Sequence, residues 1–108
     1  MEVLNEVVLV RYPFSDLTAA RIRPAVIVGV FARSPDHLIV PLTSRTSQLA
    51  PGEFTLVDWR RAGLNVPSAV KRGVYTVHAN LILKSVGRLS SADARQVEDS
   101  LRQWFELS

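Results

Sequence analysis

Residues 21–31 read RIRPAVIVGVF, and the rest of the chain is organised around this stretch. It begins with two arginines and continues as an apolar run rich in β-branched residues, which is typical of a buried strand. Pro24 fixes its own backbone angle and disfavours a helical conformation at Arg23. We therefore expect Arg23 to be extended at the point where a loop enters a rigid strand, which is a good place to hold a charge at a defined position.

A second apolar run ends in hydroxyl groups and another arginine. Residues 38–45 read LIVPLTSR, so Thr43 and Ser44 follow the last apolar positions and Arg45 comes next. If the two runs form antiparallel neighbouring strands, the start of the first lies beside the end of the second. The sequence therefore predicts that Arg23 and Thr43 meet at one rim of a sheet.

The composition is that of a small globular protein. Its 108 residues predict one domain over residues 1–108, and 47% hydrophobic residues are enough to form a core. Because the chain has no cysteine, a disulfide framework, a thiolate metal site and a cysteine nucleophile are excluded. The chain shows no long apolar run and no signal-peptide pattern, so we expect a cytoplasmic protein without membrane contact.

Positive charge is concentrated in the body of the chain. Between Arg11 and Arg88, 11 Lys and Arg residues stand against four acidic residues, whereas Asp93 to Glu106 carries four acids and two arginines. Arginine outnumbers lysine eleven to two, and a guanidinium group can bind phosphate with two donors at once. This balance favours a polyanion such as nucleic acid, and a net charge of +3 also fits an ordinary solvated surface.

The remaining patterns predict several short strands joined by polar loops. The predicted strands cover residues 3–12, 24–31, 37–43, 53–57, 68–77 and 81–89. A short helical turn is expected at 58–63, with Asp58 as a possible N-cap and Gly63 as the stop.

The end of the chain predicts a helix from about Ser91 to Phe105. Ser90 and Asp93 have the spacing of a capping box. The apolar residues that should pack on the sheet recur at helical spacing: Val97, Leu101, Trp104 and Phe105. Short strands followed by one helix predict a mainly β fold, a small barrel with a C-terminal helix.

Arg23 and Thr43 are the candidate catalytic residues. An RNA phosphodiester can be cleaved without metal when its own 2′-hydroxyl attacks the adjacent phosphate, and the enzyme must then stabilise a phosphorane and move two protons. A fixed guanidinium matches two phosphate oxygens, and a threonine hydroxyl can donate to the same group or orient the attacking hydroxyl. The alternative is structural, with Arg23 in a surface ion pair and Thr43 merely ending a strand.

No other catalytic or metal site is supported by a motif. The chain has no Gly-rich phosphate loop and no nucleophile elbow. Its two histidines, His37 and His78, stand in different segments, whereas zinc sites use three or four protein ligands. We therefore expect no metal and no cofactor.

Four segments together resemble a known family: 7–17 (VVLVRYPFSDL), 23–26 (RPAV), 41–44 (PLTS) and 87–90 (GRLS). In order and spacing they resemble the MazF/PemK toxins of bacterial type II toxin–antitoxin systems, and residues 58–68 resemble one branch of that family. The resemblance implies an SH3-like barrel with a C-terminal helix, a homodimer, and metal-independent, sequence-selective cleavage of single-stranded RNA. It also implies a cognate antitoxin, DNA binding through the antitoxin complex, and products with a 2′,3′-cyclic phosphate and a 5′-hydroxyl.

The resemblance also implies which residues form the site. The family's Arg-Pro arginine maps onto Arg23 and its strand-end threonine onto Thr43, and the loop from Ser15 to Ile22 is implied to cover RNA. The residues expected to contact RNA are Ser15, Asp16, Arg21, Ser44, Arg45, Lys71 and Arg72.

Two departures from the family pattern affect the expected chemistry. Members often carry Arg-x-Asp on a later strand, whereas residues 71–73 read KRG, so the positive charge is kept and the carboxylate is missing. The proton acceptor is then unassigned, with Asp16 and His78 as substitutes. Ile22 stands beside Arg23 where some members have a second functional residue, and it offers no proton chemistry.

Two other functions remain open from the sequence. The missing carboxylate allows a catalytically silent RNA-binding or partner-binding module. A gyrase-binding toxin on the same barrel needs a C-terminal Trp-Gly-Ile, and here Trp104 is followed by Phe105 and Glu106. Trp59 and Trp104 could stack RNA bases, but we expect core or dimer packing for both.

Overall fold

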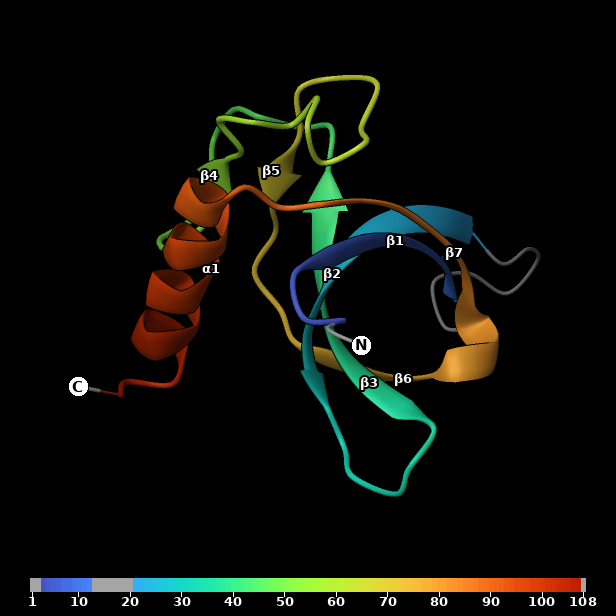
Figure 1. Cartoon of the computed structure of the whole chain (residues 1–108). Helices are drawn as coiled ribbons and strands as arrows, with labels where there is room; N and C mark the ends of the chain where they lie inside the picture. Colours follow the sequence, from blue (N-terminus) through green and yellow to red (C-terminus); the bar gives the residue numbers. More distant parts are fainter. Residues whose placement is uncertain (1–2, 13–20, 108) are drawn as a thin grey trace.

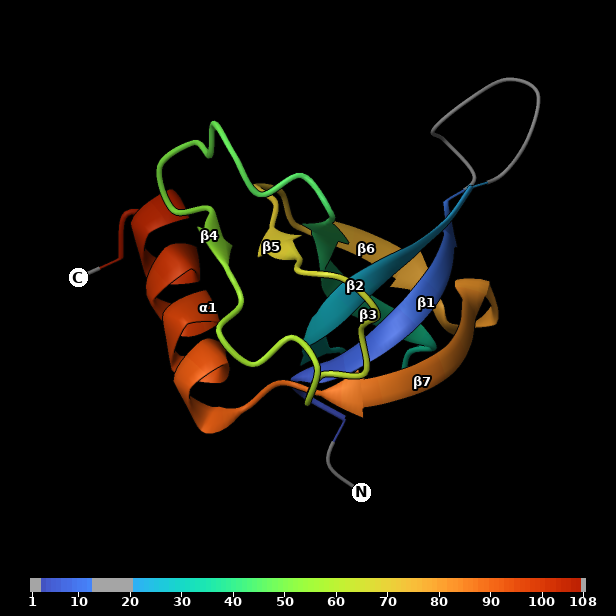
Figure 2. The ribbon, with the colours of Figure 1, turned by 90° about the horizontal axis from the view of Figure 1, so that it is seen from above.

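The computed structural model describes residues 3–12 and 21–107, which form a curled antiparallel sheet with one helix beside it (Figures 1 and 2). The elements in chain order are β1 (Glu6–Tyr12), β2 (Arg21–Val30), β3 (Asp36–Thr43), β4 (Phe54–Thr55), β5 (Ala69–Val70), β6 (Tyr75–His78), the 3₁₀ turn η1 (Ala79–Leu81), β7 (Ile82–Arg88) and α1 (Ser91–Trp104). The predicted mainly β architecture with a C-terminal helix is therefore confirmed.

The strands follow the order β4-β5-β3-β2-β1-β7, and β6 also pairs with β3. In Figure 1 the chain from β1 to β3, together with β6 and β7, curls around a common centre. Among the described residues no ladder joins β4 to β7, so the barrel is open along that side. This opening lies on the side that the helix and the long connection before β5 occupy in Figure 2.

The central strands bury both of their faces, which explains their continuous apolar sequence. Val7, Val26 and Val40 belong to a core cluster that faces α1, and Val97 of the helix belongs to the same cluster. Their neighbours in the chain, such as Val8 and Ile27, belong to a second cluster inside the curl. Alternate residues therefore serve two cores, one on each side of the sheet.

Helix α1 begins at a serine cap and packs through its buried face. Ser90 Oγ accepts a hydrogen bond from the Asp93 N–H at 3.2 Å, as the capping-box spacing predicted. Ser100 Oγ donates to the Gly52 carbonyl at 2.6 Å, and Trp104 Nε1 donates to the Pro51 carbonyl at 3.0 Å. The expected packing of Phe105 is wrong, because the helix ends at Trp104 and Phe105 is 57% exposed.

Two predicted strands are interrupted because backbone donors bond elsewhere. The strand predicted at 68–77 is wrong: β5 and β6 are separate, and between them the Arg72 N–H donates to the Glu53 carboxylate at 2.7 Å. Gly73 follows with φ 138°, which an extended strand does not contain. The strand predicted at 53–57 shrinks to β4, because the Val57 N–H donates to the Asp93 carboxylate at 3.0 Å.

The other ends of the predicted elements move for similar reasons. The segment predicted as a strand from Leu81 starts with η1, because His78 Nδ1 accepts from the Asn80 N–H at 3.0 Å. Residues 58–63 form the short helical turn that was expected, since the Ala62 N–H donates to the Asp58 carbonyl at 3.1 Å. Asp58 donates its own N–H to the Asp93 carboxylate instead of capping with its side chain. The expected stop at Gly63 is confirmed by its φ of 87°.

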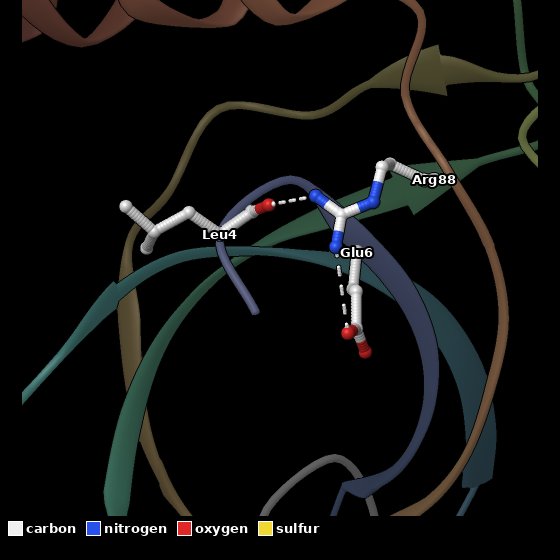
Figure 3. A network of polar contacts seen from close by, with 3 residues as sticks. All are labelled: Leu4, Glu6 and Arg88. Atoms are coloured by element: carbon white, nitrogen blue, oxygen red, sulfur yellow. Dashed lines mark hydrogen bonds and ion pairs between the residues drawn. The ribbon is translucent and has the colours of Figure 1, made fainter. Parts of the chain in front are cut away.

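The arginine of the 87–90 segment fastens the N-terminal part of the chain to β7 (Figure 3). Arg88 Nη1 donates to the Leu4 carbonyl at 2.8 Å, and Nη2 lies 3.7 Å from a Glu6 carboxylate oxygen. Asn5, between them, has φ 71°, so β1 starts at Glu6 rather than at Val3. The segment 87–90 therefore contributes to structure at this end of the sheet.

No helix in the described ranges has the length and apolar character that crossing a membrane requires.

Candidate functional site

A cavity of about 500 Å³ lies where β2 begins and β3 ends, and both Arg23 and Thr43 line it. The ladder between the strands explains this meeting, because Ala25 pairs with Pro41 in an antiparallel register. Arg23 lies two positions before Ala25 and Thr43 lies two positions after Pro41, so both residues lie at the same end of this pair of strands. The structure thus brings together the two residues that the sequence placed at one rim of the sheet.

The floor of the cavity is a row of paired residues across three strands, apolar in its middle and with a lysine at one edge. Leu9 of β1 pairs with Pro24 of β2 on one side and with Lys84 of β7 on the other. All three residues line the cavity, and Leu42 of β3 extends the apolar lining. Lys84 therefore places an ammonium group at the edge of an apolar floor, where its stem can lie on the sheet.

Every charged side chain among the described cavity residues is positive. Arg23 and Lys84 are both exposed, and no Asp or Glu lines the cavity within the described ranges. The described part of the chain forms two ion pairs, Arg88 with Glu6 and Arg102 with Glu98, so neither cavity cation is neutralised by one. Two unneutralised cations over an apolar floor form a site for an anion.

Thr43 and Ser44 add hydroxyl groups to the two cations. Thr43 Oγ1 accepts a hydrogen bond from the Arg45 N–H at 3.1 Å. This bond uses one lone pair of the hydroxyl and leaves its hydrogen available, because no described residue accepts it. Thr43 is therefore prepared to donate a hydrogen bond to an anion held by Arg23.

The wall opposite the hydroxyls comes from the connection between β4 and β5, residues 57–67, which we call the 57–67 loop. Residues 63–66 of this loop line the cavity. The loop is closed at its base, where the Leu56 N–H donates to the Ser68 carbonyl at 2.9 Å. Ser68 Oγ also donates to the Val66 carbonyl at 3.0 Å, so the wall is held by its own backbone.

A buried carboxylate fixes the start of this loop. Asp93 is 2% exposed, and its two oxygens accept from the Val57 N–H at 3.0 Å and the Asp58 N–H at 2.9 Å. Asp93 belongs to the first turn of α1, so helix and cavity wall form one connected unit. The capping-box carboxylate thus serves a segment 35 residues away rather than the N-cap backbone.

Two glycines allow the loop to cross β7 in close contact. A Cβ on Gly63 would overlap the Val86 carbonyl, and a Cβ on Gly87 would overlap the Ala62 carbonyl. Gly63 also has φ 87°, which side chains disfavour. Because Val86 and Gly63 both line the cavity, this crossing sets the distance between the wall and the floor.

The expected RNA-contacting residues divide into three groups. Ser44 lines the cavity. Arg21 and Arg45 are exposed and lie close in sequence to Arg23 and Thr43, but they do not line the cavity. Ser15 and Asp16 lie outside the described residues.

Lys71 and Arg72, which are also expected to contact RNA, lie outside the cavity lining, and the strand register explains why. Thr43 pairs with Ala69, and the Lys71 N–H donates to the Pro41 carbonyl at 2.9 Å. The antiparallel direction therefore carries residues 71 and 72 away from the end of β3, and neither lines the cavity. The Arg72 backbone is instead held by Glu53.

His78 is not a base for this cavity within one chain. It pairs with Asp36 at the other end of β3 from Thr43. At about 3.3 Å per residue, the two ends of that strand are roughly 20 Å apart. Its Nδ1 is also occupied as the acceptor of the Asn80 N–H.

His37 does not belong to a group of metal ligands among the described residues. His37 Nδ1 is buried and has no hydrogen-bond partner in the described part of the chain. Within residues 3–12 and 21–107, no three His, Asp or Glu side chains gather as metal ligands would. The cavity offers nitrogen cations, hydroxyls and an amide, which suit an anion rather than a metal ion.

The two tryptophans pack against the helix-side core, as expected. Trp59 and Trp104 are half-buried against that cluster. The Arg60 guanidinium lies 4.6 Å from the centre of the Trp59 ring, in a cation–π contact. Trp104 is held through its indole nitrogen, so neither ring lines the cavity.

Lys84, Asn65 and the rest of the 57–67 loop were not predicted from the sequence as part of the site. Lys84 carried one signal, because it is the single charge within the otherwise uncharged run 82–87 of a predicted strand. Asn65 carried none, because its place in the cavity depends on the Gly63 crossing and the Asp93 anchor.

Comparisons with known proteins agree with this fold. A family model described as "PemK-like, MazF-like toxin of type II toxin-antitoxin system" matches residues 5–105. A comparison with curated protein sequences gives no match.

Solved structures share the fold at low sequence identity. "Endoribonuclease in complex with its cognate antitoxin from Mycobacterial species" is 16% identical with a TM-score of 0.76, over 100% of this chain and 98% of that chain. "Mycobacterium tuberculosis toxin MazF-mt6" is 21% identical with a TM-score of 0.73, over 95% and 98%. "Endoribonuclease from Mycobacterial species" is 17% identical with a TM-score of 0.69, over 99% and 95%.

Proposed function

Because the chain belongs to the family of PemK-like, MazF-like toxins of type II toxin–antitoxin systems, we propose that it is a metal-independent, sequence-selective endoribonuclease that cleaves single-stranded RNA. The observation that carries this proposal is the cavity in which Arg23 and Thr43 meet with Lys84 and without a carboxylate among the described lining residues. Such a site suits a phosphodiester, which is an anion flanked by neutral sugars and bases. Two of the similar structures are described as endoribonucleases, which supports the same activity.

The reaction needs no bound metal. The 2′-oxygen forms a bond to phosphorus while the bond to the 5′-oxygen breaks, which leaves a 2′,3′-cyclic phosphate and a 5′-hydroxyl. One proton leaves the attacking 2′-hydroxyl and one reaches the departing 5′-oxygen. Negative charge develops on the phosphoryl oxygens of the phosphorane, where fixed donors act most strongly.

The two central residues divide this work. The Arg23 guanidinium offers two donors to the phosphoryl oxygens, and Pro24 behind it keeps its backbone in place. The Thr43 hydroxyl donates a further hydrogen bond to the phosphoryl group. Its oxygen already accepts from the Arg45 N–H, which leaves the hydroxyl hydrogen for the substrate. Lys84 adds positive charge from the opposite edge of the floor. Removing one such donor typically lowers a rate about 10²–10³-fold.

One feature favours an alternative, RNA binding without cleavage. Among the described residues the cavity contains no His, Asp or Glu that could accept the proton of the 2′-hydroxyl. Asp16, one of the two substitutes considered from the sequence, lies outside the described residues.

The remaining assignments follow the family and are part of the same proposal. We expect a homodimer in the cytoplasm and a cognate antitoxin that blocks RNA entry, and one similar structure is described as a complex with its cognate antitoxin. Binding to DNA would take place through the antitoxin complex.

Incubation with single-stranded RNA in EDTA tests the proposal. We expect cleavage that survives chelation, 5′-hydroxyl ends on the products, and loss of nearly all cleavage in Arg23→Ala. Arg102→Ala is the matched control, because Arg102 is an exposed arginine of α1 away from the cavity. RNA that stays intact but still binds to the wild-type protein would support the alternative and refute the nuclease.

A further inference from the structure

We propose that Asn65 recognises the RNA base next to the phosphate held by Arg23 and Thr43, and that adenine is the base it favours. This inference rests on the proposed function, because it concerns the substrate sequence of that same site. Asn65 lines the cavity from the 57–67 loop, whereas Arg23 and Thr43 line it from the sheet. A nucleotide whose phosphate contacts the sheet side would therefore have its base near the loop.

The amide of Asn65 is available for a ligand. The residue is exposed, and no described residue forms a hydrogen bond with its side chain. An asparagine amide presents one acceptor oxygen and a donor nitrogen side by side. Among the cavity residues of the described chain it is the one side chain with both functions in this planar arrangement.

The residues beside Asn65 suit the flat face of a base. Val66 is 49% exposed and lines the cavity, as does Leu64. Apolar side chains at the cavity edge can pack against an unstacked base while the amide bonds with its edge. The loop thus combines an apolar surface for any base with one group that distinguishes between bases.

The loop holds the backbone that carries Asn65 in place before RNA binds. Asp93 binds the N–H groups of Val57 and Asp58, and the Leu56 N–H donates to the Ser68 carbonyl at 2.9 Å. The Gly63 crossing over β7 fixes the middle of the loop two residues before Asn65. Discrimination between bases benefits from such a fixed attachment point, because the amide then reaches the edge of the base from a defined position.

Adenine matches the amide best, because it is the one base that presents a hydrogen-bond donor beside an acceptor on both its Watson–Crick edge (N6 and N1) and its Hoogsteen edge (N6 and N7). An asparagine can accept from the adenine N6 amino group and donate to N7 at the same time. The same edge of guanine presents two acceptors, O6 and N7, so an amide there leaves its oxygen facing another acceptor. A bidentate contact of this kind discriminates against the wrong base by about tenfold to a hundredfold.

Sequencing of 5′-hydroxyl ends from a randomised RNA pool tests the inference. Wild-type protein should show a preference for adenine at one position beside the cleaved bond. Asn65→Ala should lose about tenfold to a hundredfold of that preference and keep the preferences at other positions. Asn65→Asp should change the base preference at the same position. A carboxylate cannot donate to adenine N7, so the preference should move from adenine toward a base with two adjacent donors, such as guanine with its N1–H and N2 amino group.

Asn80→Ala is the matched control, since Asn80 is an exposed asparagine in η1 outside the cavity. Its cut-site profile should equal that of the wild type. A wild-type profile that Asn65→Ala and Asn65→Asp both leave unchanged would overturn the role of Asn65 while the nuclease stands. A wild-type protein that leaves RNA intact would overturn both.

Discussion

The Arg45 N–H donates to Thr43 Oγ1 across 3.1 Å, at the end of β3, and the neighbouring strand β2 carries Arg23 near its start. This bond is local, joining residues two apart, and it forms without any ligand. It orients the threonine hydroxyl so that its lone pair faces the backbone. The hydrogen is then left for the cavity, where a phosphoryl oxygen can accept it.

Two replacements of Thr43 should distinguish the contribution of its hydroxyl to the cleavage rate from the contribution of its shape. Thr43→Val keeps the shape but removes the donor, and we expect a loss of about 10²-fold in single-turnover RNA cleavage. Thr43→Ser keeps the hydroxyl and should stay within a few-fold of wild type. The effect should be smaller than that of Arg23→Ala. Equal rates for the Val and Ser variants would show that the hydroxyl takes no part.

The two lysines of the chain give a matched pair for testing the position of the site. Lys84 lines the cavity and Lys71 does not. Lys84→Ala should weaken binding of single-stranded RNA and reduce the slope of log K against log salt by about 0.7, the value for one lost phosphate contact. Lys71→Ala should change both quantities less, as measured by fluorescence anisotropy across a salt series. The reverse order would move the RNA path away from the cavity.

Loss of the Asp93 carboxylate should destabilise the whole protein. Asp93→Ala would leave the buried N–H groups of Val57 and Asp58 without acceptors, and we expect a loss of about 3 kcal/mol in the free energy of unfolding. Asp99→Ala, an exposed acid on the same helix, should change it by less than about 0.5 kcal/mol. Urea denaturation measures both, and similar midpoints would mean that the Asp93 contacts add nothing to stability.

Glu53 should make stability depend on pH in the acid range. Hydrogen bonds from the Arg72 N–H and the Ala50 N–H hold the pKa of its carboxyl below the ordinary 4.5. The folded pKa is the lower one, so its stabilisation is fully present above about pH 4.5 and is lost as pH falls through the folded value.

The variant Glu53→Gln isolates this contribution. It should be less stable than wild type in urea at pH 7, and the difference should shrink once both forms are neutral at low pH. Glu106→Gln, at an exposed position, is the control. A difference that stays constant from pH 7 to low pH would show that ionisation of Glu53 does not contribute.

The sequence was a good guide to the central strands and the helix because their patterns are set by local burial. The segment from Ala25 to Ile27 is buried on both faces, and the spacing of Val97 and Leu101 matches one helix face. The short strands were misjudged because long-range acceptors decide them. Glu53 binds the Arg72 N–H and Asp93 binds the Val57 N–H, and neither contact leaves a periodic signal.

The site was predictable where two strands define it and unpredictable where the loop does. Arg23 and Thr43 could be brought together from antiparallel pairing alone. Lys71 was predicted to contact RNA near Thr43, but Thr43 pairs with Ala69 and Lys71 does not line the cavity. Asn65 came into the cavity only through the folding of a loop that a helix residue holds from the far end of the sequence.

The crossing of Gly63 over Gly87 also bears on how this gene can be inactivated. Every amino acid that a single base change can introduce at a glycine codon carries a Cβ, and at both positions that atom would overlap a backbone carbonyl. If the protein arrests growth, bacteria that escape it should accumulate missense alleles at these two codons as readily as at the codon for Arg23. Such alleles would mark a backbone junction that acts by holding the cavity wall in position and carries no functional side chain.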